Sequence, residues 1–273
     1  MVKKVAAIHD LSGIGRCSLT AAIPIISALK VQCCPLPTAI LSSQTGYPKF
    51  TFLDFTDEMT NYYKTWNELN INFDCIYSGF LGSIDQVDIV SNFINLNKNS
   101  FVIIDPVMGD NGELYSIFSF DMCNKIKDLV KLSNLTTPNI TEACFLTDRD
   151  LSKKDYSDAE LISIAKDISL LGPDKVVITG IIKNDEILNL AYDKITDKHF
   201  FTSVHYNNCS YSGTGDIFTS ILCGLLTNGY DFKFSVEFAT NFIFDTIEYT
   251  HKYNTDPRDG VMFEAKLNKL TSI

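Results

Sequence analysis

A chain of 273 residues is long enough for one sizeable α/β domain or two small ones, and with 45% hydrophobic and 21% charged residues it has the composition of a folded protein. Its net charge of −10 argues against nucleic acids and anionic membranes as partners, because both are bound through basic surfaces. We expect a cytoplasmic protein with reduced thiols: the eight cysteines form no C-x-x-C pair, the N-terminus lacks a signal-peptide core, and no apolar run is long enough to span a membrane.

Short apolar runs alternate along the chain with segments of helical periodicity. The apolar runs predict strands at residues 4–9, 31–35, 73–78, 101–105, 135–137 and 175–179. The segments between them predict helices at residues 18–29, 57–69, 86–95, 120–130, 158–170 and 215–226. This alternation is typical of a mostly parallel sheet with helices on both faces, here in a single domain of residues 1–273. Residues 187–205 instead predict an antiparallel hairpin that turns at 194–197.

The first polar segment after a predicted strand is His9-Asp10-Leu11-Ser12-Gly13-Ile14-Gly15-Arg16. Ligands of parallel sheets gather at the carboxyl ends of the strands, so this loop is a candidate for ligand binding. It matches neither the G-x-G-x-x-G fingerprint nor a Walker A sequence, which argues against Rossmann and P-loop nucleotide binding. Ser12 is a candidate for a hydrogen bond to a small polar ligand. For His9 we expect a packing role.

The second segment is Asp105-Pro106-Val107-Met108-Gly109-Asp110-Asn111-Gly112, which follows the apolar run 101–104. Asp105 would project from the strand end toward a ligand. Residues 109–112 could act as a lid that excludes water from the reaction. An ordinary β-turn is the alternative.

The third segment is Thr137-Pro138-Asn139-Ile140-Thr141-Glu142. Proline ends the strand and a helix begins near Asn139, so that Asn139 and Glu142 share the first turn. An amide and a carboxylate at this place could hold magnesium directly or through water. The alternative is a helix-capping pair with no ligand.

The fourth segment is Ser212-Gly213-Thr214-Gly215-Asp216, which leads directly into an apolar helix. The two glycines allow a close approach of the backbone to a ligand, and the N–H groups of the helix start suit an anion. Asp216, in the first turn, could accept a proton from a substrate hydroxyl while the N–H groups stabilise a transferred phosphoryl group. A tight turn with a capping aspartate is the alternative.

Together, these segments resemble the ribokinase-like superfamily and, within it, the pyridoxal kinase family. Ser42-Ser43-Gln44-Thr45-Gly46-Tyr47 is similar to the second substrate loop of that family, and the resemblance runs from about residue 3 to residue 250. It implies a three-layer α/β/α sandwich that uses ATP and Mg²⁺, assisted by a monovalent cation such as K⁺. The implied reaction is phosphorylation of the 5′-hydroxymethyl group of a vitamin B6 vitamer (pyridoxal, pyridoxine or pyridoxamine), for salvage of the vitamin. Members of the family form homodimers.

The resemblance also implies a role for individual residues. The catalytic residues would be Asp216 as the base, with an anion hole formed by Gly213, Thr214 and Gly215. The substrate would be bound by Ser12, Thr45, Phe80 and Asp216, with Phe80 against the pyridine ring. The nucleotide would be bound by Asp105, Thr137, Glu142, Thr179 and Thr214. Magnesium would be bound by Asp105, Asn139 and Glu142.

The chain departs from the family pattern in three places. The segment after Gly109 has no basic residue and no cysteine, so neither a phosphate contact nor covalent capture of an aldehyde by a lid is expected. Phe80 stands where some relatives carry tyrosine, and residues 255–273 match nothing. Two other functions stay open. A hydroxymethylpyrimidine kinase of thiamine synthesis usually has a Gly-Ser-Asp-Ser-rich N-terminal loop, which is absent here. A non-catalytic pyridoxal phosphate binding protein would not need Asp216.

Overall fold

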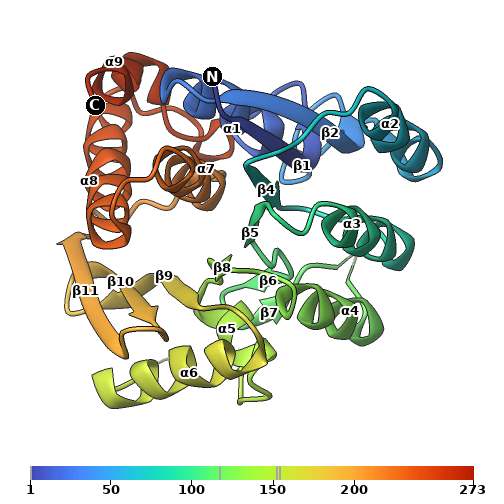
Figure 1. The fold of residues 1–273 in the computed structure, drawn as a ribbon. Coiled ribbons are helices and arrows are strands. Elements are labelled where there is room, and N and C mark those ends of the chain that lie inside the picture. Colours follow the sequence, from blue (N-terminus) through green and yellow to red (C-terminus); the bar gives the residue numbers. More distant parts are fainter. Residues whose placement is uncertain (1, 117, 152, 154) are drawn as a thin grey trace. The chain divides into compact units, whose positions relative to one another are not determined.

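The computed structural model describes residues 2–116, 118–151, 153 and 155–273. The chain divides into two compact units (Figure 1). The first unit comprises Met1–Phe101 and Asn207–Ile273, and the second unit comprises Val102–Tyr206. No helix in the described part of the chain combines the length and the apolar character needed to cross a membrane.

The first unit contains a sheet with the strand order β4-β1-β2-β3. Its strands are β1 (Lys4–Ser12), β2 (Gln32–Leu41), β3 (Phe52–Asp54) and β4 (Cys75–Ser78). β1 lies parallel to both β2 and β4, whereas β3 pairs antiparallel with the end of β2. The central residues of β1 are all fully buried. A parallel strand covered on both faces needs this continuous apolar run, in place of an alternating pattern.

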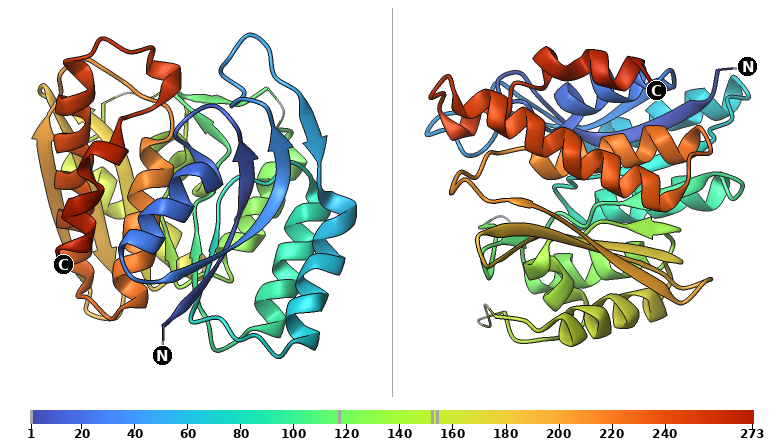
Figure 2. Two further views of the ribbon diagram at one scale, coloured as in Figure 1. Left: turned by 90° about the horizontal axis from the view of Figure 1, so that it is seen from above. Right: turned by 90° about the vertical axis from the view of Figure 1, so that its left-hand side faces the viewer.

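Helices cover both faces of this sheet (Figure 2). One face carries α1 (Ser18–Ala28), α7 (Thr214–Thr227) and α8 (Phe232–His251), and the other carries α2 (Thr56–Glu68) and α3 (Ile84–Leu96). α1 and α7 approach each other closely because Gly224 of α7 faces Leu29: a Cβ there would lie 2.5 Å from a leucine methyl carbon. The chain ends in three short helices: η1 (Pro257–Asp259), η2 (Phe263–Lys266) and α9 (Leu267–Thr271).

The second unit contains the parallel strands β5 (Phe101–Ile104), β8 (Leu135–Thr136) and β9 (Lys175–Lys183), in that order. Antiparallel strands β10 (Glu186–Asp193) and β11 (Lys198–His205) continue the sheet. Its helices are α4 (Phe120–Val130), α5 (Ile140–Leu146) and α6 (Asp158–Leu171), of which α6 packs on β9 and β10. A two-stranded hairpin of β6 (Gly109–Asp110) and β7 (Glu113–Leu114) stands apart from the sheet.

The predicted alternation of strands and helices is confirmed, as is the hairpin, which pairs Asp193 with Lys198 across the predicted turn. β2 differs from the prediction because it continues to Leu41, through Pro35 and Pro37. Proline cannot donate a hydrogen bond to a neighbouring strand. β3 pairs with β2 only from Ala39 to Leu41, so among the described strands the proline-containing part pairs with β1 alone. The single-domain assignment stays a prediction.

Candidate functional site

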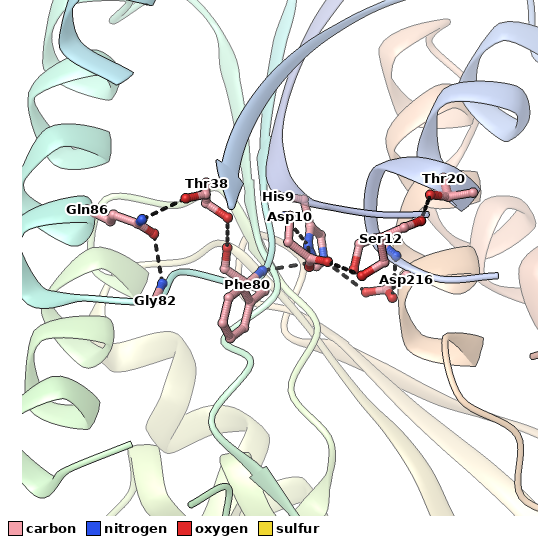
Figure 3. A network of polar contacts seen from close by, with 10 residues as sticks. His9, Asp10, Ser12, Thr20, Thr38, Phe80, Gly82, Gln86 and Asp216 are labelled. Atoms are coloured by element: carbon pink, nitrogen blue, oxygen red, sulfur yellow. Dashed lines mark hydrogen bonds and ion pairs between the residues drawn. The ribbon is translucent and has the colours of Figure 1, made fainter. Parts of the chain in front are cut away.

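A chain of hydrogen bonds crosses the first unit at the carboxyl end of β1 (Figure 3). At its centre, His9 places Nδ1 2.9 Å from Oδ1 of Asp10 and Nε2 3.0 Å from Oδ1 of Asp216. The Ser12 hydroxyl donates to the other oxygen of Asp10 at 2.7 Å. The backbone N–H of Ser18 donates to Oδ2 of Asp216 at 2.8 Å. The N-terminal loop and the start of α7, about 200 residues apart in the sequence, therefore share one polar network.

The surroundings of His9 favour a positive charge on its ring. A neutral imidazole has one donor and one acceptor nitrogen, whereas a carboxylate oxygen lies within hydrogen-bond distance of each nitrogen of His9, which favours a ring that donates from both. Burial of the ring opposes the charge, yet the carboxylates of Asp216 and Asp10 raise the pKa of His9 to about 10. The N–H groups of Asp10 and Phe80 lie 3.0 and 3.4 Å from these nitrogens. Both N–H groups donate toward the ring, so each ring nitrogen faces one backbone donor and one carboxylate oxygen.

Neighbouring residues pack closely around the His9 ring. A Cβ on Gly79 would lie 2.0 Å from the ring, so only glycine fits beside it. The edge of the Tyr77 ring packs against it at a centroid distance of 6.3 Å. Burial, followed by the charges of Asp216 and Asp10, raises the pKa of the Cys17 thiol to about 12, so this neighbour stays neutral. Burial would also raise the pKa of Asp10, but the hydrogen bond and charge of His9 hold it below its ordinary value.

Asp216 lies in the first turn of α7, after the predicted glycine-rich turn. Gly213 has a φ of +80°, and a Cβ there would lie 2.1 Å from the carbonyl oxygen of Arg16, so that glycine is required. Thr214 begins the helix. A Cβ on Gly215 would meet no heavy atom within 4 Å, so there is open space beside the helix start. The first N–H groups of a helix have no acceptor within it, and they can bind an anion in such a space.

The predicted substrate residues differ in exposure. Ser12 is fully buried, Phe80 is half-buried and Thr45 is exposed. The two predicted substrate loops lie side by side, because Gly13 N donates to Leu41 O and Gln44 N donates to Ile14 O, both at 2.9 Å. The structure thus brings Thr45, at the tip of the second loop, close in the fold to the N-terminal loop. Direct contact of Ser12 with a ligand stays a prediction.

A buried glutamine fixes the segment that carries Phe80 (Figure 3). Gln86 accepts a hydrogen bond from Gly82 N at 2.7 Å and donates one to Thr38 O at 2.9 Å. The Thr38 hydroxyl in turn donates to Phe80 O at 3.0 Å. The backbone from Phe80 to Gly82, which follows β4, is therefore held in place.

The C-terminal segment (residues 256–264), in which no motif is recognisable from the sequence, contacts both substrate loops and the glycine-rich turn. Its backbone accepts three N–H or amide hydrogen bonds at 3.1 Å, donated by Arg16 N, Ser212 N and Gln44 Nε2. Asp259 accepts a hydrogen bond from the Tyr47 hydroxyl, and this bond raises the pKa of Tyr47 to about 12. Glu264 pairs with Arg16 at 2.7 Å. The segment therefore belongs to the structure that supports the site.

In the second unit, the predicted nucleotide residues also lie together. Asn139 and Glu142 form a full capping box: each side chain accepts a hydrogen bond from the backbone N–H of the other residue. Asn139 also donates to Gly109 O at 2.8 Å and lies beside Thr179 of β9 in a parallel bridge. Thr137 is buried at the end of β8. The capping interpretation is thus confirmed, and the side chain of Asn139 uses both its polar atoms within the protein.

Asp105 and Glu142 form a pair of buried acids in the second unit. Burial and the neighbouring Asp105 carboxylate raise the pKa of Glu142 well above its ordinary value, although the backbone N–H groups of Asn139 and Met108 oppose the rise. No group of three His, Cys, Asp or Glu residues suited to a metal is present in the described residues. Mg²⁺ is commonly held by only one or two carboxylates, together with water and substrate phosphates. Asp105 and Glu142 therefore fit a magnesium site, because a bound cation would relieve the repulsion between their carboxylates.

The predicted lid residues form the β6–β7 hairpin. A Cβ on Gly109 would lie 2.2 Å from Glu113 O, so the two short strands can meet only with glycine at this position. Gly112 adopts a φ of +83°, and its N–H donates to the Thr141 hydroxyl at 2.9 Å, which ties the hairpin to α5. Its closure over a ligand stays a prediction.

Comparison with known proteins agrees with this geometry. The model of the phosphomethylpyrimidine kinase family matches residues 17–260. A candidate phosphomethylpyrimidine kinase from Bacteroides thetaiotaomicron, crystallised with pyridoxal, is 41% identical, with a TM-score of 0.95 over 99% of this chain and 96% of that one. The pyridoxal kinase of Dictyostelium discoideum is 25% identical, over 92% of this chain and 87% of that one. The structure of pyridoxal kinase from Lactobacillus plantarum (24% identity, TM-score 0.91, 100% and 98% coverage) confirms the predicted ribokinase-like fold.

Proposed function

Because the chain belongs to the phosphomethylpyrimidine kinase family, we propose that it transfers the γ-phosphoryl group of ATP to the 5′-hydroxymethyl group of a vitamin B6 vitamer. The observation that carries the proposal is the Asp216 carboxylate, paired with the His9 imidazolium at the start of α7. A carboxylate there can accept the proton of a substrate hydroxyl. The N–H groups of Gly213, Thr214 and Gly215 would stabilise the charge on the phosphoryl group in the transition state of the transfer.

The vitamer ring would lie against Phe80, whose backbone carbonyl accepts a hydrogen bond from Thr38, which in turn is held by Gln86. A flat heteroaromatic ring gains contact area on an aromatic side chain. Thr45, exposed on its loop, would hydrogen-bond a ring substituent or the ring nitrogen. Ser12 donates to Asp10, so its oxygen has lone pairs left to accept a hydrogen bond from the ligand.

The second unit would serve the nucleotide. Asp105 and Glu142 would hold Mg²⁺, with Asn139 fixing the backbone next to them, and Thr137 and Thr179 would contact ATP. The resemblance also assigns Thr214 to the nucleotide. The metal would neutralise charge on the phosphates. The proposal includes K⁺ as an activator and a homodimer, and these two points rest on the resemblance to pyridoxal kinases. It also includes a cytoplasmic location and a single kinase domain, and these two rest on the composition and organisation of the sequence.

A second candidate function is phosphorylation of hydroxymethylpyrimidine; the matching family is named for a kinase of the related phosphomethylpyrimidine. Both substrates are ring-bearing primary alcohols, so the same base and anion hole would serve either. Two observations favour the B6 vitamer: the N-terminal loop lacks the Gly-Ser-Asp-Ser pattern of the pyrimidine enzymes, and the 41% identical B. thetaiotaomicron structure contains pyridoxal.

The test is a product assay by liquid chromatography and mass spectrometry. Purified protein with ATP, Mg²⁺ and K⁺ is given pyridoxal, pyridoxine, pyridoxamine and hydroxymethylpyrimidine separately. We expect phosphorylation of at least one B6 vitamer, with a loss of about 10²–10⁴-fold in Asp216→Asn. Turnover of the pyrimidine alone would assign the second candidate. No turnover together with tight binding of pyridoxal phosphate would leave a binding protein.

A further inference from the structure

We propose that His9 is a positioning residue for the proposed phosphoryl transfer: as a cation between two aspartates, it holds the Asp216 carboxylate in the orientation that accepts the substrate proton. This inference rests on the proposed function. It assigns a role in the reaction to a residue that the sequence indicated only as packing.

The geometry around Asp216 leaves few orientations open. Its Oδ1 accepts from His9 Nε2 at 3.0 Å, and its Oδ2 accepts from Ser18 N at 2.8 Å. Ser18 has a φ of +52°, an unfavourable conformation for a residue with a side chain, and this backbone directs its N–H at the carboxylate. Two donors from different elements, one on each oxygen, fix the plane of the carboxylate. The remaining lone pairs are available to a substrate hydroxyl.

Without a cation between them, the buried carboxylate of Asp10 and the partly buried carboxylate of Asp216 would repel each other in one network. His9 supplies the positive charge that both need. The other titratable groups that face the ring or the two carboxylates are Tyr77 and the Cys17 thiol, which do not supply a cation at neutral pH. The ring cannot turn away, because Gly79 lies against it and Asp10 holds its other nitrogen. The fold therefore holds the His9 ring in place as a hydrogen-bond donor to Asp216.

Substitution of His9 by glutamine or by asparagine tests its two hydrogen bonds one at a time. In His9→Gln, the amide nitrogen can take the place of Nε2 and keep a donor to Asp216. In His9→Asn, the shorter amide can take the place of Nδ1 and keep a donor only to Asp10. A misplacement of about 1 Å in a reacting group can cost about 10²-fold. We therefore expect a kcat loss of about tenfold in His9→Gln and about 10²-fold or more in His9→Asn, with KM for the vitamer changed less than about threefold in both.

The experiment measures kcat and KM of the wild type, the two variants and the control His205→Gln, whose histidine is exposed on β11 of the second unit and whose kinetics should not change. Equal kcat values in the two variants, or a loss confined to KM, would overturn the proposal. A wild type without kinase activity would instead reject the proposed function.

If neither variant folds, a measurement on the wild-type protein tests the proposal instead. Nuclear magnetic resonance of ¹⁵N-histidine-labelled protein at pH 8 should show both ring nitrogens of His9 protonated, with a change in the Nε2 signal in Asp216→Asn. A neutral His9 ring, or an Nε2 signal insensitive to Asp216→Asn, would overturn the proposal.

Discussion

The acidic side chains of the two units differ in how their negative charge is balanced. In the first unit, Asp10 and Asp216 share the imidazolium of His9, and the pKa of Asp10 is held below its ordinary value. In the second unit, Glu142 is shifted by burial, by the Asp105 carboxylate and by backbone N–H groups, and its pKa rises well above its ordinary value. The carboxylate that we propose as the base thus has a cationic partner within the protein. The pair of acids that we propose to bind Mg²⁺ does not have such a partner among the groups that shift the pKa of Glu142.

The largest expected effect concerns the pH dependence of stability. The folded-state pKa of His9 is about 10 and its ordinary value is 6.5, so its contribution is fully present below pH 6.5 and is lost as the pH rises toward 10. Each unit of pKa shift corresponds to about 1.4 kcal/mol, so the loss should reach a few kcal/mol. Denaturant unfolding of the wild type and His9→Gln at pH 6.5, 8 and 9.5 measures it: the wild type should lose stability more steeply. Parallel curves would contradict the charged His9.

Substitution by alanine should have different effects on stability at Gly79 and at Gly215. Gly79→Ala places a Cβ 2.0 Å from the His9 ring, so we expect about 1–3 kcal/mol of lost stability together with lost activity. Gly215→Ala meets no atom and improves helix propensity, so the fold should be kept or slightly stabilised.

Activity should still fall in Gly215→Ala, because the methyl group enters the proposed anion hole. Thermal unfolding and kcat, measured on both variants, separate packing from chemistry. If Gly215→Ala were destabilised as much as Gly79→Ala, or if it kept full activity, the proposal that the anion occupies the open space beside Gly215 would be contradicted.

The acid pair of the second unit predicts a magnesium effect on stability. The pKa of Glu142 is raised, so the folded state loses stability as the pH rises from about 4.5 through the folded-state value. Without metal, Glu142→Gln should therefore lose less stability than the wild type as the pH rises from 5 to 8, although it lacks one of the two oxygens that accept Met108 N and Asn139 N. Mg²⁺ should raise the melting temperature of the wild type and not that of the variant, and the Mg²⁺ concentration needed for half-maximal activity should rise about tenfold or more in the variant. Equal stabilisation of both proteins by Mg²⁺ would place the metal elsewhere.

The smallest expected effect is in the C-terminal segment. Tyr47→Phe removes the hydrogen bond to Asp259 but keeps the ring against Arg258. A partly exposed hydrogen bond contributes about 1 kcal/mol, so stability should fall only slightly, while KM for the vitamer should rise a few-fold because the second substrate loop is held less firmly. Steady-state kinetics on Tyr47→Phe measure this, and a change confined to kcat would contradict a role in holding the loop.

Much of this comparison was predictable from the sequence. Strand ends, turn glycines and the Asn139–Glu142 spacing are local patterns, and they are sufficient to indicate Asp105 and Asp216. Thr45, Phe80 and Thr179 are implied only by the resemblance to pyridoxal kinases. The link between His9 and Asp216 was not predictable, because the two residues are 207 positions apart and their pairing depends on how β1 and α7 pack. The contribution of residues 256–264 was missed for the same reason: it is made largely by backbone carbonyl groups, which leave no side-chain pattern.

The most direct test of the division between the units is to separate binding from turnover in Asp216→Asn. Calorimetry measures the affinities for pyridoxal and for Mg²⁺ with an ATP analogue, and a quenched assay measures kcat at saturating substrates. The account predicts affinities within about threefold of the wild type and a kcat lower by about 10²–10⁴-fold. A variant that turns over at the wild-type rate, or one that fails because it no longer binds the Mg²⁺–nucleotide, would contradict the assignment of the base to the first unit and of the metal to the second.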